Sequence, residues 1–471
     1  MRTMGLRRGR VACAAGLVGL LGLSGIAAEP GGDNAAAKTQ DQQEGRPMSV
    51  HQVSLIDVKD FGPGALRIGD LNGDGAPDLL LVQSIYETRE ITCLTAITIR
   101  GEVIWQKGTP SASNTRLYSD LPVQVYDWDN DGANEVLYVR QAKYVGARPG
   151  IRERADRYEG DATMVVLDAR NGQEKKTFPL PAPADDSFLF ADLTGRGRRQ
   201  DLVAKDRYWN LWGVSFEGKV LWHWKGSTGH FPAVADLDDD GKDEVYVGYT
   251  LIDHDGKVLF DRHPAGGNPN PHSDANWILR LPDGSWRLAF GNTGVHLLTP
   301  DGKELWRANL PEAQHVVAGP FRGDSPAQLA AVERGERTPA GVGTLHLFDL
   351  DGKRLWKKVL PPGSWAIAIE EIDWSGAGQP REILAYGFRS VREYAAVYDG
   401  AGNVVDTLAV PFKAPGVKVS GKEACYSLRA NVWGDSRHEV ILYGAAGICI
   451  YANARPLAEP TLYNETLYTG M

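Results

Sequence analysis

The chain has 471 residues, enough to bury a large hydrophobic core. Its 51 basic and 60 acidic side chains leave a net charge of −9, and no basic patch stands out, which argues against a nucleic acid as partner. Near the N-terminus, four arginines precede an apolar run, and small residues at Ala27 and Ala28 offer a cleavage site. This pattern is typical of a secretory signal. A membrane anchor is the alternative, but the run is short for a span.

We therefore expect three parts in the chain. Residues 1–28 are predicted to be a signal peptide, residues 29–48 a disordered leader without periodicity, and residues 49–471 one folded domain. These boundaries predict a secreted or periplasmic protein with no membrane span in the mature chain. We expect it to be a monomer.

Three nine-residue loops carry oxygen-bearing side chains at positions 1, 3, 5 and 9, with Gly at position 6. The side chains in question are Asp70, Asn72, Asp74 and Asp78, then Asp127, Asp129, Asp131 and Glu135, and then Asp236, Asp238, Asp240 and Glu244. Alternate oxygens in a tight loop can close around one hard cation. Each loop runs into an extended apolar stretch rather than a helix, so the pattern predicts structural calcium-binding turns between β-strands.

A second repeated element is a turn at Gly followed by a strand that often ends in Trp. Clear copies begin at Gly101, Gly218, Gly256, Gly302 and Gly352, and weaker copies begin at Gly172 and Gly402. An Asp or Asn directly precedes the Gly in four of them, at Asn171, Asp255, Asp301 and Asp351. Asx-Gly between apolar runs is a strong hairpin signal, so each copy predicts a β-hairpin.

Acidic-loop positions, some of them degenerate, begin near residues 70, 127, 192, 236, 279, 320, 373 and 431. Each unit is predicted to form four strands, with the acidic loop after the innermost strand and the Gly hairpin before the outermost. This repeat predicts an all-β chain with a single eight-bladed β-propeller. Seven blades is the alternative, if one degenerate unit is an insertion. The segment Val50 to Val58 has no loop of its own and is predicted to complete the last blade.

Seven of the ten histidines fall between residues 223 and 315. His230, His272 and His315 stand at nearly the same place, the entrance to the innermost strand of three successive blades. Such entrances surround the mouth of a propeller's central channel, so these histidines are candidate catalytic residues. Asp274 is a candidate to orient His272.

Three other interpretations of the histidines stay open. They could hold a transition metal such as zinc, neutralise an acidic sugar by charge, or cap strand ends. His223 and His254 are expected to be structural, because the first lies beside Trp222 and the second in a hairpin turn.

Cys93, Cys425 and Cys449 remain after the signal, an odd number that excludes a disulfide framework. Cys425 and Cys449 could pair if adjacent strands bring them together. Alternatively, all three are small buried hydrophobes.

The acidic loops resemble those of FG-GAP or VCBS-type calcium propellers, and the Gly-Lys-x-Leu-Trp turns are similar to those of quinoprotein propellers. Together with the segments around His230, His254, His272 and His315 and the tail Tyr463–Glu465, the chain resembles the rhamnogalacturonan and ulvan lyases of bacteria. This resemblance implies β-elimination of an acidic polysaccharide. In that reaction a positive group neutralises the uronate, a base removes the C5 proton, and an acid protonates O4. The resemblance assigns neither base nor acid to a residue.

Three functional hypotheses follow. The first, which we favour, is a secreted lyase that cleaves a uronate-containing polysaccharide. The second is a non-catalytic extracellular propeller that binds glycan or protein. The third is a quinone-dependent dehydrogenase, to which the acidic loops are foreign.

Overall fold

The computed structural model describes residues 49–61, 64–85, 89–111, 117, 120–141, 162–181, 187–206, 209–263, 273–292, 294–335, 342–361, 366–387, 395–410, 425–444 and 447–457. The expected signal peptide and leader lie outside these residues, as do His272 and the tail Tyr463–Glu465.

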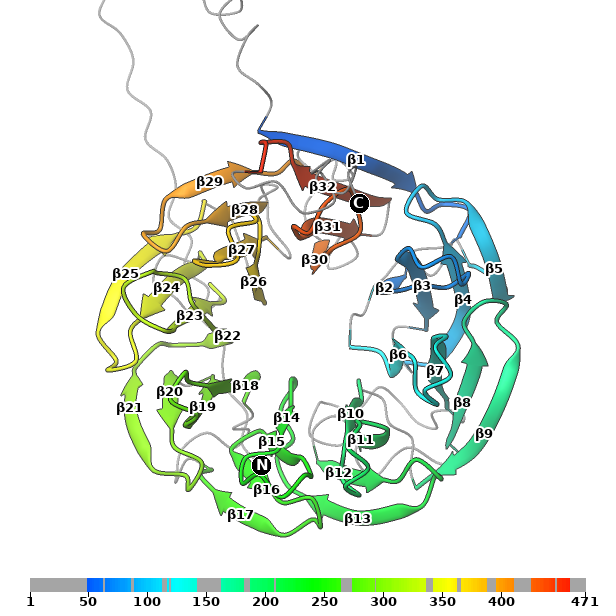
Figure 1. The fold of residues 1–471 in the computed structure, drawn as a ribbon, viewed down its shortest axis with the longest axis horizontal. Helices are drawn as coiled ribbons and strands as arrows, with labels where there is room; N and C mark the ends of the chain where they lie inside the picture. Colours follow the sequence, from blue (N-terminus) through cyan, green and yellow to red (C-terminus); the bar gives the residue numbers. More distant parts are fainter. Residues whose placement is uncertain are drawn as a thin grey trace, which may run out of the picture. The chain divides into compact units, whose positions relative to one another are not determined.

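Eight four-stranded antiparallel sheets make up the described part of the chain, and they stand as blades around a ring (Figure 1). In seven of them the strands follow chain order from the centre outwards. No helix occurs among the described residues. The prediction of an all-β, eight-bladed propeller is therefore confirmed, and the seven-bladed alternative is wrong.

The first four blades contain sixteen strands in chain order. Blade 1 comprises β2 (Ala65–Gly69), β3 (Asp78–Ser84), β4 (Ile91–Ile97) and β5 (Val103–Gly108). Blade 2 comprises β6 (Val123–Tyr126), β7 (Glu135–Arg140), β8 (Ala162–Asp168) and β9 (Glu174–Leu180). Blade 3 comprises β10 (Leu189–Ala191), β11 (Asp201–Lys205), β12 (Asn210–Val214) and β13 (Val220–Lys225). Blade 4 comprises β14 (Ala233–Ala235), β15 (Glu244–Val247), β16 (Thr250–Ile252) and β17 (Val258–Asp261).

The other four blades complete the ring. Blade 5 comprises β18 (Ala275–Arg280), β19 (Trp286–Gly291), β20 (Val295–Leu298) and β21 (Glu304–Ala308). Blade 6 comprises β22 (Ala313–Gly319), β23 (Gln328–Glu333), β24 (Thr344–Phe348) and β25 (Arg354–Val359). Blade 7 comprises β26 (Ile369–Ile372), β27 (Glu382–Tyr386), β28 (Ala395–Tyr398) and β29 (Val404–Thr407). Blade 8 comprises β30 (Cys425–Ala430), β31 (Glu439–Gly444), β32 (Gly447–Asn453) and β1 (Val50–Asp57).

Strand β1 closes the ring by joining the two ends of the chain in one sheet. It pairs antiparallel with β32, from Val50 opposite Asn453 to Asp57 opposite Gly447. Without β1, the fully buried strand β32 would present an open apolar edge, which is a template for aggregation. The prediction that this early segment completes the last blade is confirmed.

Four of the eight blades are also fastened to the next by a tryptophan at the outer rim. The indole nitrogen of Trp222 donates to the carbonyl of His254 at 2.7 Å, in the hairpin of the following blade. Three other blades repeat this inter-blade contact, with the pairs Trp105–Ala169, Trp306–Leu350 and Trp356–Gly400. Gly256 lies under the Trp222 ring with φ of 89°, and a Cβ there would approach Trp222 to 2.6 Å. The Gly turn and the Trp therefore recur together because they touch across blades.

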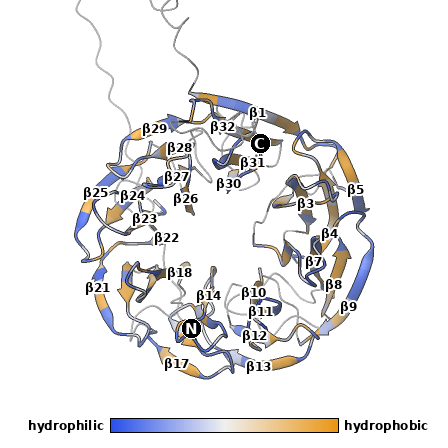
Figure 2. Cartoon of the chain, viewed as in Figure 1, coloured by the Kyte–Doolittle hydropathy of each residue, from blue (hydrophilic) through white to orange (hydrophobic). Residues whose placement is uncertain are grey.

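Burial differs between the strands of a blade. The second and third strands, such as β3 and β15, are almost wholly buried between neighbouring blades. The outermost strands alternate, and Figure 2 colours them in successive hydrophilic and hydrophobic stretches. This pattern is expected of a strand with one face on the core and one face in water.

The three cysteines that the structure describes are buried, and none of them forms a disulfide with another. Cys425 lies on β30 and Cys449 on β32, and β31 separates these strands. The pairing alternative is therefore wrong, because the two cysteines are not on adjacent strands. Within the described ranges, no helix is long and apolar enough to cross a membrane.

We predict that β1 is required for a soluble ring. Deleting residues 1–58 removes β1, whereas deleting residues 1–48 retains it and serves as the matched control. The longer deletion should lower the melting temperature and cause association, measured by calorimetry and size-exclusion chromatography, because it leaves β32 unpaired. Equal stability and monomeric elution of both proteins would contradict this role.

Candidate functional site

Alternating strand direction separates two groups of loops onto the two faces of the ring. The acidic loop joins the first strand to the second, and the Gly hairpin joins the third to the fourth, so both lie at one edge of each blade. The entrances to the innermost strands lie at the opposite edge. The predicted histidine site and the predicted calcium loops therefore occupy opposite faces.

At the entrance face, four side chains from the inner strands of blades 2, 4, 5 and 6 come together. We call Asp120, His230, Asp274 and His315 the entrance cluster. Asp120 precedes β6 by three residues, His230 precedes β14 by three residues, and Asp274 directly precedes β18. His315 lies in β22 at a register shift, which turns its side chain relative to its neighbours.

The backbone before β14 is fixed against the backbone before β18. The His230 amide donates to the Ser273 carbonyl at 3.2 Å, and Phe231 forms an isolated parallel bridge with Ala275. Gly229 allows this approach, because its φ is 59° and a Cβ would lie 2.2 Å from the Ser273 oxygen. The buried ammonium of Lys205 donates to the Gly229 carbonyl at 2.9 Å. These contacts hold His230 beside Asp274.

The His230 ring lies between two carboxylates. Its Nδ1 is 3.6 Å from Asp120 Oδ2, and its Nε2 is 3.8 Å from Asp274 Oδ1. Both distances exceed a hydrogen bond but permit ion pairing with a protonated ring. The side chain is 17% exposed, so it remains accessible from solvent.

Asp274 is the hub of the cluster. It is buried, and its Oδ2 accepts a hydrogen bond from the Asn292 amide at 2.7 Å. Burial raises the pKa of Tyr249, and the charge of Asp274 raises that pKa further. Tyr249 is buried against Phe290, in agreement with a packing role.

His315 is neutral across the physiological pH range. Burial lowers its pKa to about 4, although Asp274 and the backbone of Ile369 act in the opposite direction. Its Nδ1 is buried and has no hydrogen-bond partner in the described part of the chain. Phe231 packs edge-on against the ring, with centroids 5.3 Å apart. His315 thus offers an unprotonated nitrogen next to the pair formed by His230 and Asp274.

The cluster differs from the expected one in two respects. His272 lies outside the described residues, so its predicted pairing with Asp274 is not tested. Asp274 lies beside His230 instead. Asp120 is not among the site residues predicted from the sequence, although its position three residues before an inner strand matches that of His230. The feature of the sequence that could have identified Asp120 is its position in the repeat, since no local motif surrounds it.

On the other face, the first acidic loop is closed by its own backbone. The Asp70 carboxylate accepts hydrogen bonds from the amides of Asn72, Gly73 and Gly75. Asp78 accepts from the Leu71 amide, and burial raises its pKa to about 6. This loop is not among the acidic groups that gather three ligand atoms within the described ranges.

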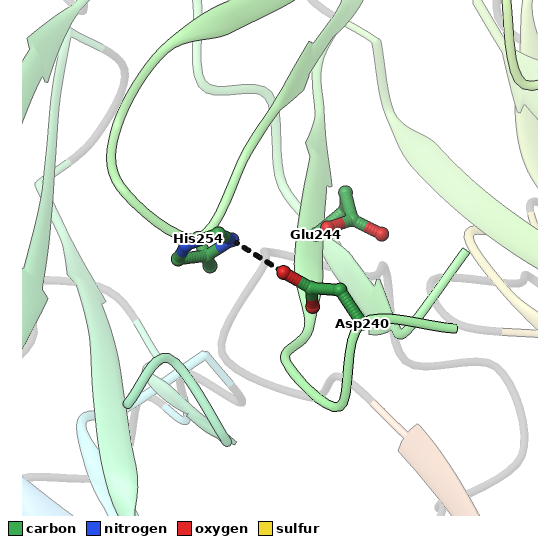
Figure 3. A group of neighbouring side chains, drawn as sticks. All are labelled: Asp240, Glu244 and His254. Atoms are coloured by element: carbon green, nitrogen blue, oxygen red, sulfur yellow. Dashed lines mark ion pairs between the residues drawn. The ribbon is translucent and has the colours of Figure 1, made fainter. Parts of the chain in front are cut away.

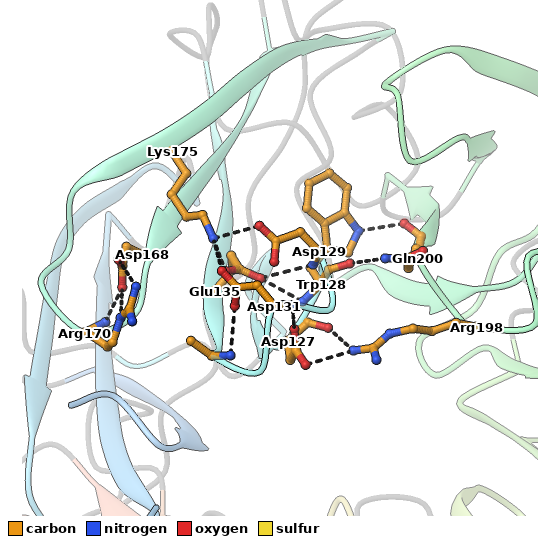
Figure 4. Close-up of polar contacts among 11 residues, drawn as sticks. Asp127, Trp128, Asp129, Asp131, Glu135, Asp168, Arg170, Lys175, Arg198 and Gln200 are labelled. Atoms are coloured by element: carbon orange, nitrogen blue, oxygen red, sulfur yellow. Dashed lines mark hydrogen bonds and ion pairs between the residues drawn. The ribbon is translucent and has the colours of Figure 1, made fainter. Parts of the chain in front are cut away.

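The second loop holds an ammonium group where the motif expects a metal ion (Figure 4). Lys175 Nζ lies 2.7 Å from Asp129 Oδ2, 3.1 Å from Asp131 Oδ2 and 2.7 Å from Glu135 Oε1. Burial alone would lower the pKa of Lys175, but these carboxylates outweigh it and raise the pKa. Asp127, Asp129 and Glu135 still bring three oxygens within 4.8 Å of one another, so the loop keeps donors for a cation beside this ammonium. Calcium in this loop stays a prediction.

The loop of blade 4 fits a cation. Asp236, Asp238 and Glu244 bring three oxygens within 4.8 Å of one another. Glu244 is buried, and its Oε1 has no hydrogen-bond partner among the described residues. Burial raises the pKa of Glu244 to about 7, with further repulsion from neighbouring carboxylates. An oxygen left unpaired in such a cluster is what a bound calcium ion would satisfy. Calcium here, and zinc at the histidines, remain predictions.

No family model matches the chain. A search of curated proteins finds the rhamnogalacturonan endolyase YesW of Bacillus subtilis (strain 168), 25% identical in an alignment of 240 residues that covers 41% of this chain. The chain is similar to a rhamnogalacturonan lyase in sequence. The match spans only 38% of that protein's length.

Solved structures share the fold. The exotype rhamnogalacturonan lyase YesX has a TM-score of 0.60 at 20% identity, with 84% of this chain and 73% of that chain covered. The rhamnogalacturonan lyase YesW has a TM-score of 0.57 at 21% identity, with the same coverage. The Vibrio cholerae biofilm matrix protein Bap1 has a TM-score of 0.58 at 13% identity, covering 87% of this chain and 91% of that one. At these identities the likeness shows a β-propeller fold.

We predict that Lys175→Met destabilises blade 2 and converts its loop into a calcium site. Three carboxylates would lose their counter-charge, so the free energy of unfolding in chelator should fall by about 1–3 kcal/mol. Added calcium should restore it. Thermal unfolding in EGTA and in calcium checks this outcome. Lys357→Met, at an exposed lysine on β25, is the control and should leave both curves unchanged. If Lys175→Met is neutral in chelator, the ammonium does not compensate the loop.

We predict that Glu244 makes calcium-free stability fall as pH rises. The folded state keeps its proton up to about pH 7, whereas an unfolded Glu releases it near its ordinary pKa of 4.5. Between those values the folded state binds more protons, so its stability decreases with rising pH. Calcium binds the deprotonated carboxylate and should add about 2.7 kcal/mol at roughly 100 times its Kd.

Calorimetry of wild type and Glu244→Gln between pH 5 and pH 8 isolates the effect of Glu244. The wild-type curve should fall relative to the variant as pH rises, and only the wild type should regain full stability with calcium. Parallel curves would show that Glu244 is not the titrating group.

Proposed function

We propose that the protein is a polysaccharide lyase that cleaves a uronate-containing chain of the rhamnogalacturonan class by β-elimination. The single observation that carries this proposal is the entrance cluster, in which two histidines share one buried aspartate at the centre of a propeller. The sequence similarity to a rhamnogalacturonan endolyase supports the substrate class. Ulvan, a second uronate-containing polymer, is an alternative substrate of the same chemistry.

The reaction requires two proton transfers at one sugar bond. A base takes the C5 proton, the electron pair forms the C4–C5 double bond, and the C4–O4 bond breaks with O4 receiving a proton. Positioned acid–base groups contribute about 10²–10⁴-fold to such steps. A nearby positive charge lowers the cost of removing the C5 proton, because it stabilises the carboxylate-conjugated carbanion.

The geometry suggests a division of labour between the two histidines. His315 is neutral at working pH and has an unpaired Nδ1 among the described residues, so it suits proton abstraction. His230 lies within ion-pair distance of Asp120 and Asp274, which would support a protonated ring that donates to O4. The buried Lys205 ammonium, which donates to the carbonyl beside His230, adds positive potential under the cluster.

We also propose where the protein acts. Residues 1–28 carry the sequence pattern of a secretory signal. A polymeric polysaccharide is degraded outside the cytoplasm. We therefore propose export, with the folded propeller acting on its substrate outside the cell or in the periplasm.

A non-catalytic binding propeller is the second candidate. The fold likeness to the biofilm matrix protein Bap1 is as close as that to the lyases, with a TM-score of 0.58 against 0.60. The fold alone therefore does not discriminate between a lyase and a binding protein. The chemistry of the entrance cluster has to decide between them.

The test follows the ultraviolet absorbance of the unsaturated uronate formed on rhamnogalacturonan, ulvan and pectin. Wild type should produce a rise on rhamnogalacturonan, and His230→Ala, His315→Gln and Asp274→Asn should each slow it by about 10²-fold or more. His51→Ala, at an exposed histidine on the outer strand β1, is the control and should retain activity.

Two results would overturn the lyase proposal. One is glycan binding without any new absorbance, which is the signature of a binding protein. The other is full activity in all three cluster variants, which would place the chemistry elsewhere. Circular dichroism and melting temperature of each variant separate a lost fold from lost chemistry.

A further inference from the structure

Blade 4 contains a second group of metal-ligand side chains, formed where its hairpin meets its acidic loop (Figure 3). The hairpin between β16 and β17 carries His254 directly after Asp253. It is held in place from the neighbouring blade, because the Trp222 indole donates to the His254 carbonyl. The sequence predicts a structural role for His254, because it lies in a hairpin turn. His254 Nδ1 lies 2.8 Å from Asp253 Oδ1 in its own turn and 3.6 Å from Asp240 Oδ2 in the acidic loop, the second contact being drawn in Figure 3.

Three donors converge at this point. Asp240, Glu244 and His254 each offer one ligand atom, and the three atoms lie within 4.8 Å of one another. They come from two different turns of the same blade, so the group does not depend on one flexible loop. The inter-blade tryptophan contact fixes one turn, and the Glu244 hydrogen bond from the Leu237 amide fixes the other.

A second, independent observation points to a ligand at this group. Glu244 is 1% exposed, and its Oε2 accepts the Leu237 amide at 2.7 Å. Its Oε1 is buried and has no hydrogen-bond partner in the described part of the chain. A buried carboxylate oxygen without a partner is costly, and a coordinated cation would satisfy it.

The donor types select the kind of ion. Calcium takes six to eight oxygen ligands, and the Asp236, Asp238 and Glu244 oxygens suit it. An imidazole with two carboxylates instead suits a first-row transition ion such as zinc. We propose that Asp240, Glu244 and His254 form a transition-metal site, which shares Asp240 and Glu244 with the predicted calcium motif and adds His254 to them.

The site is specific to blade 4. Two residues before the hairpin Gly, the position of His254, the other clear copies carry Ile99, Phe216, Pro300 and Leu350. In blade 2 the same position holds Arg170, which pairs with Asp168, and Lys175 fills the acidic loop. The chain therefore uses the same scaffold to hold a fixed ammonium in blade 2 and a ligand group in blade 4.

Lys242 competes with the ion. Its Nζ lies 3.0 Å from His254 Nε2 and 3.5 Å from Asp240 Oδ2, and its side chain is 32% exposed. An ammonium there is a weak stand-in for a metal cation, and its exposure lets it swing into solvent when an ion binds. Removing it should tighten metal binding, because the ion no longer has to displace a positive charge.

The experiment is calorimetric titration of the full chain with zinc chloride, after treatment with chelator and in the presence of saturating calcium. We expect one zinc site that His254→Ala weakens by about 10–100-fold and that Lys242→Met strengthens. Asp238→Asn should weaken calcium binding while leaving zinc binding within a few-fold, because Asp238 belongs only to the calcium group. Cobalt loaded in place of zinc should give a ligand-field spectrum that His254→Ala abolishes.

Controls keep the proposal open to refutation. His230→Ala tests the rival zinc site at the entrance cluster and should leave the titration unchanged. Zinc binding that survives His254→Ala, or that is lost in His230→Ala instead, overturns the proposal. His254→Gln, which retains a polar side chain of similar reach, should also lose zinc affinity. Unchanged melting temperatures of both His254 variants in chelator exclude a fold defect as the cause.

Discussion

In four of the eight blades, a tryptophan on the outer strand packs on the Gly hairpin of the next blade and donates a hydrogen bond to it. Each such contact combines a hydrogen bond to a carbonyl with stacking over a glycine that has no room for a Cβ. This contact joins neighbouring blades at the rim. Strand β1 closes the ring in a similar way, because it pairs with β32, which is distant in the sequence. Where the contact recurs, the hairpin of one blade is held against the outer strand of the blade before it.

The alternating strand direction within each blade separates two chemistries on two faces. Hairpins and acidic loops crowd one edge of each blade, while the entrances to inner strands converge at the other edge. Residues such as His230 and Asp274, which are 44 positions apart, meet because adjacent blades place their entrances side by side. The carboxylates of the acidic loops therefore lie on the other face from His230 and His315.

Identical loop motifs have acquired different counter-charges. The first loop satisfies its aspartate with backbone amides, the second with Lys175, and the fourth leaves Glu244 Oε1 without a partner among the described residues. The motif alone would predict three equal calcium sites. Only the side chains delivered by the neighbouring hairpin distinguish them, since burial of a carboxylate makes its nearest cation decisive.

The sequence predicts the all-β propeller and favours eight blades over seven, because the spacing of oxygen-bearing loops and Gly hairpins dictates turns and strands. The structure decides the number of blades. The sequence also indicated that histidines would gather at inner-strand entrances. It could not show that Asp120 joins His230, that Lys175 enters the second loop, or that His254 faces Asp240. Those partnerships depend on which side chains the packing of separate turns brings within a few ångströms, and no periodicity in the chain encodes that distance.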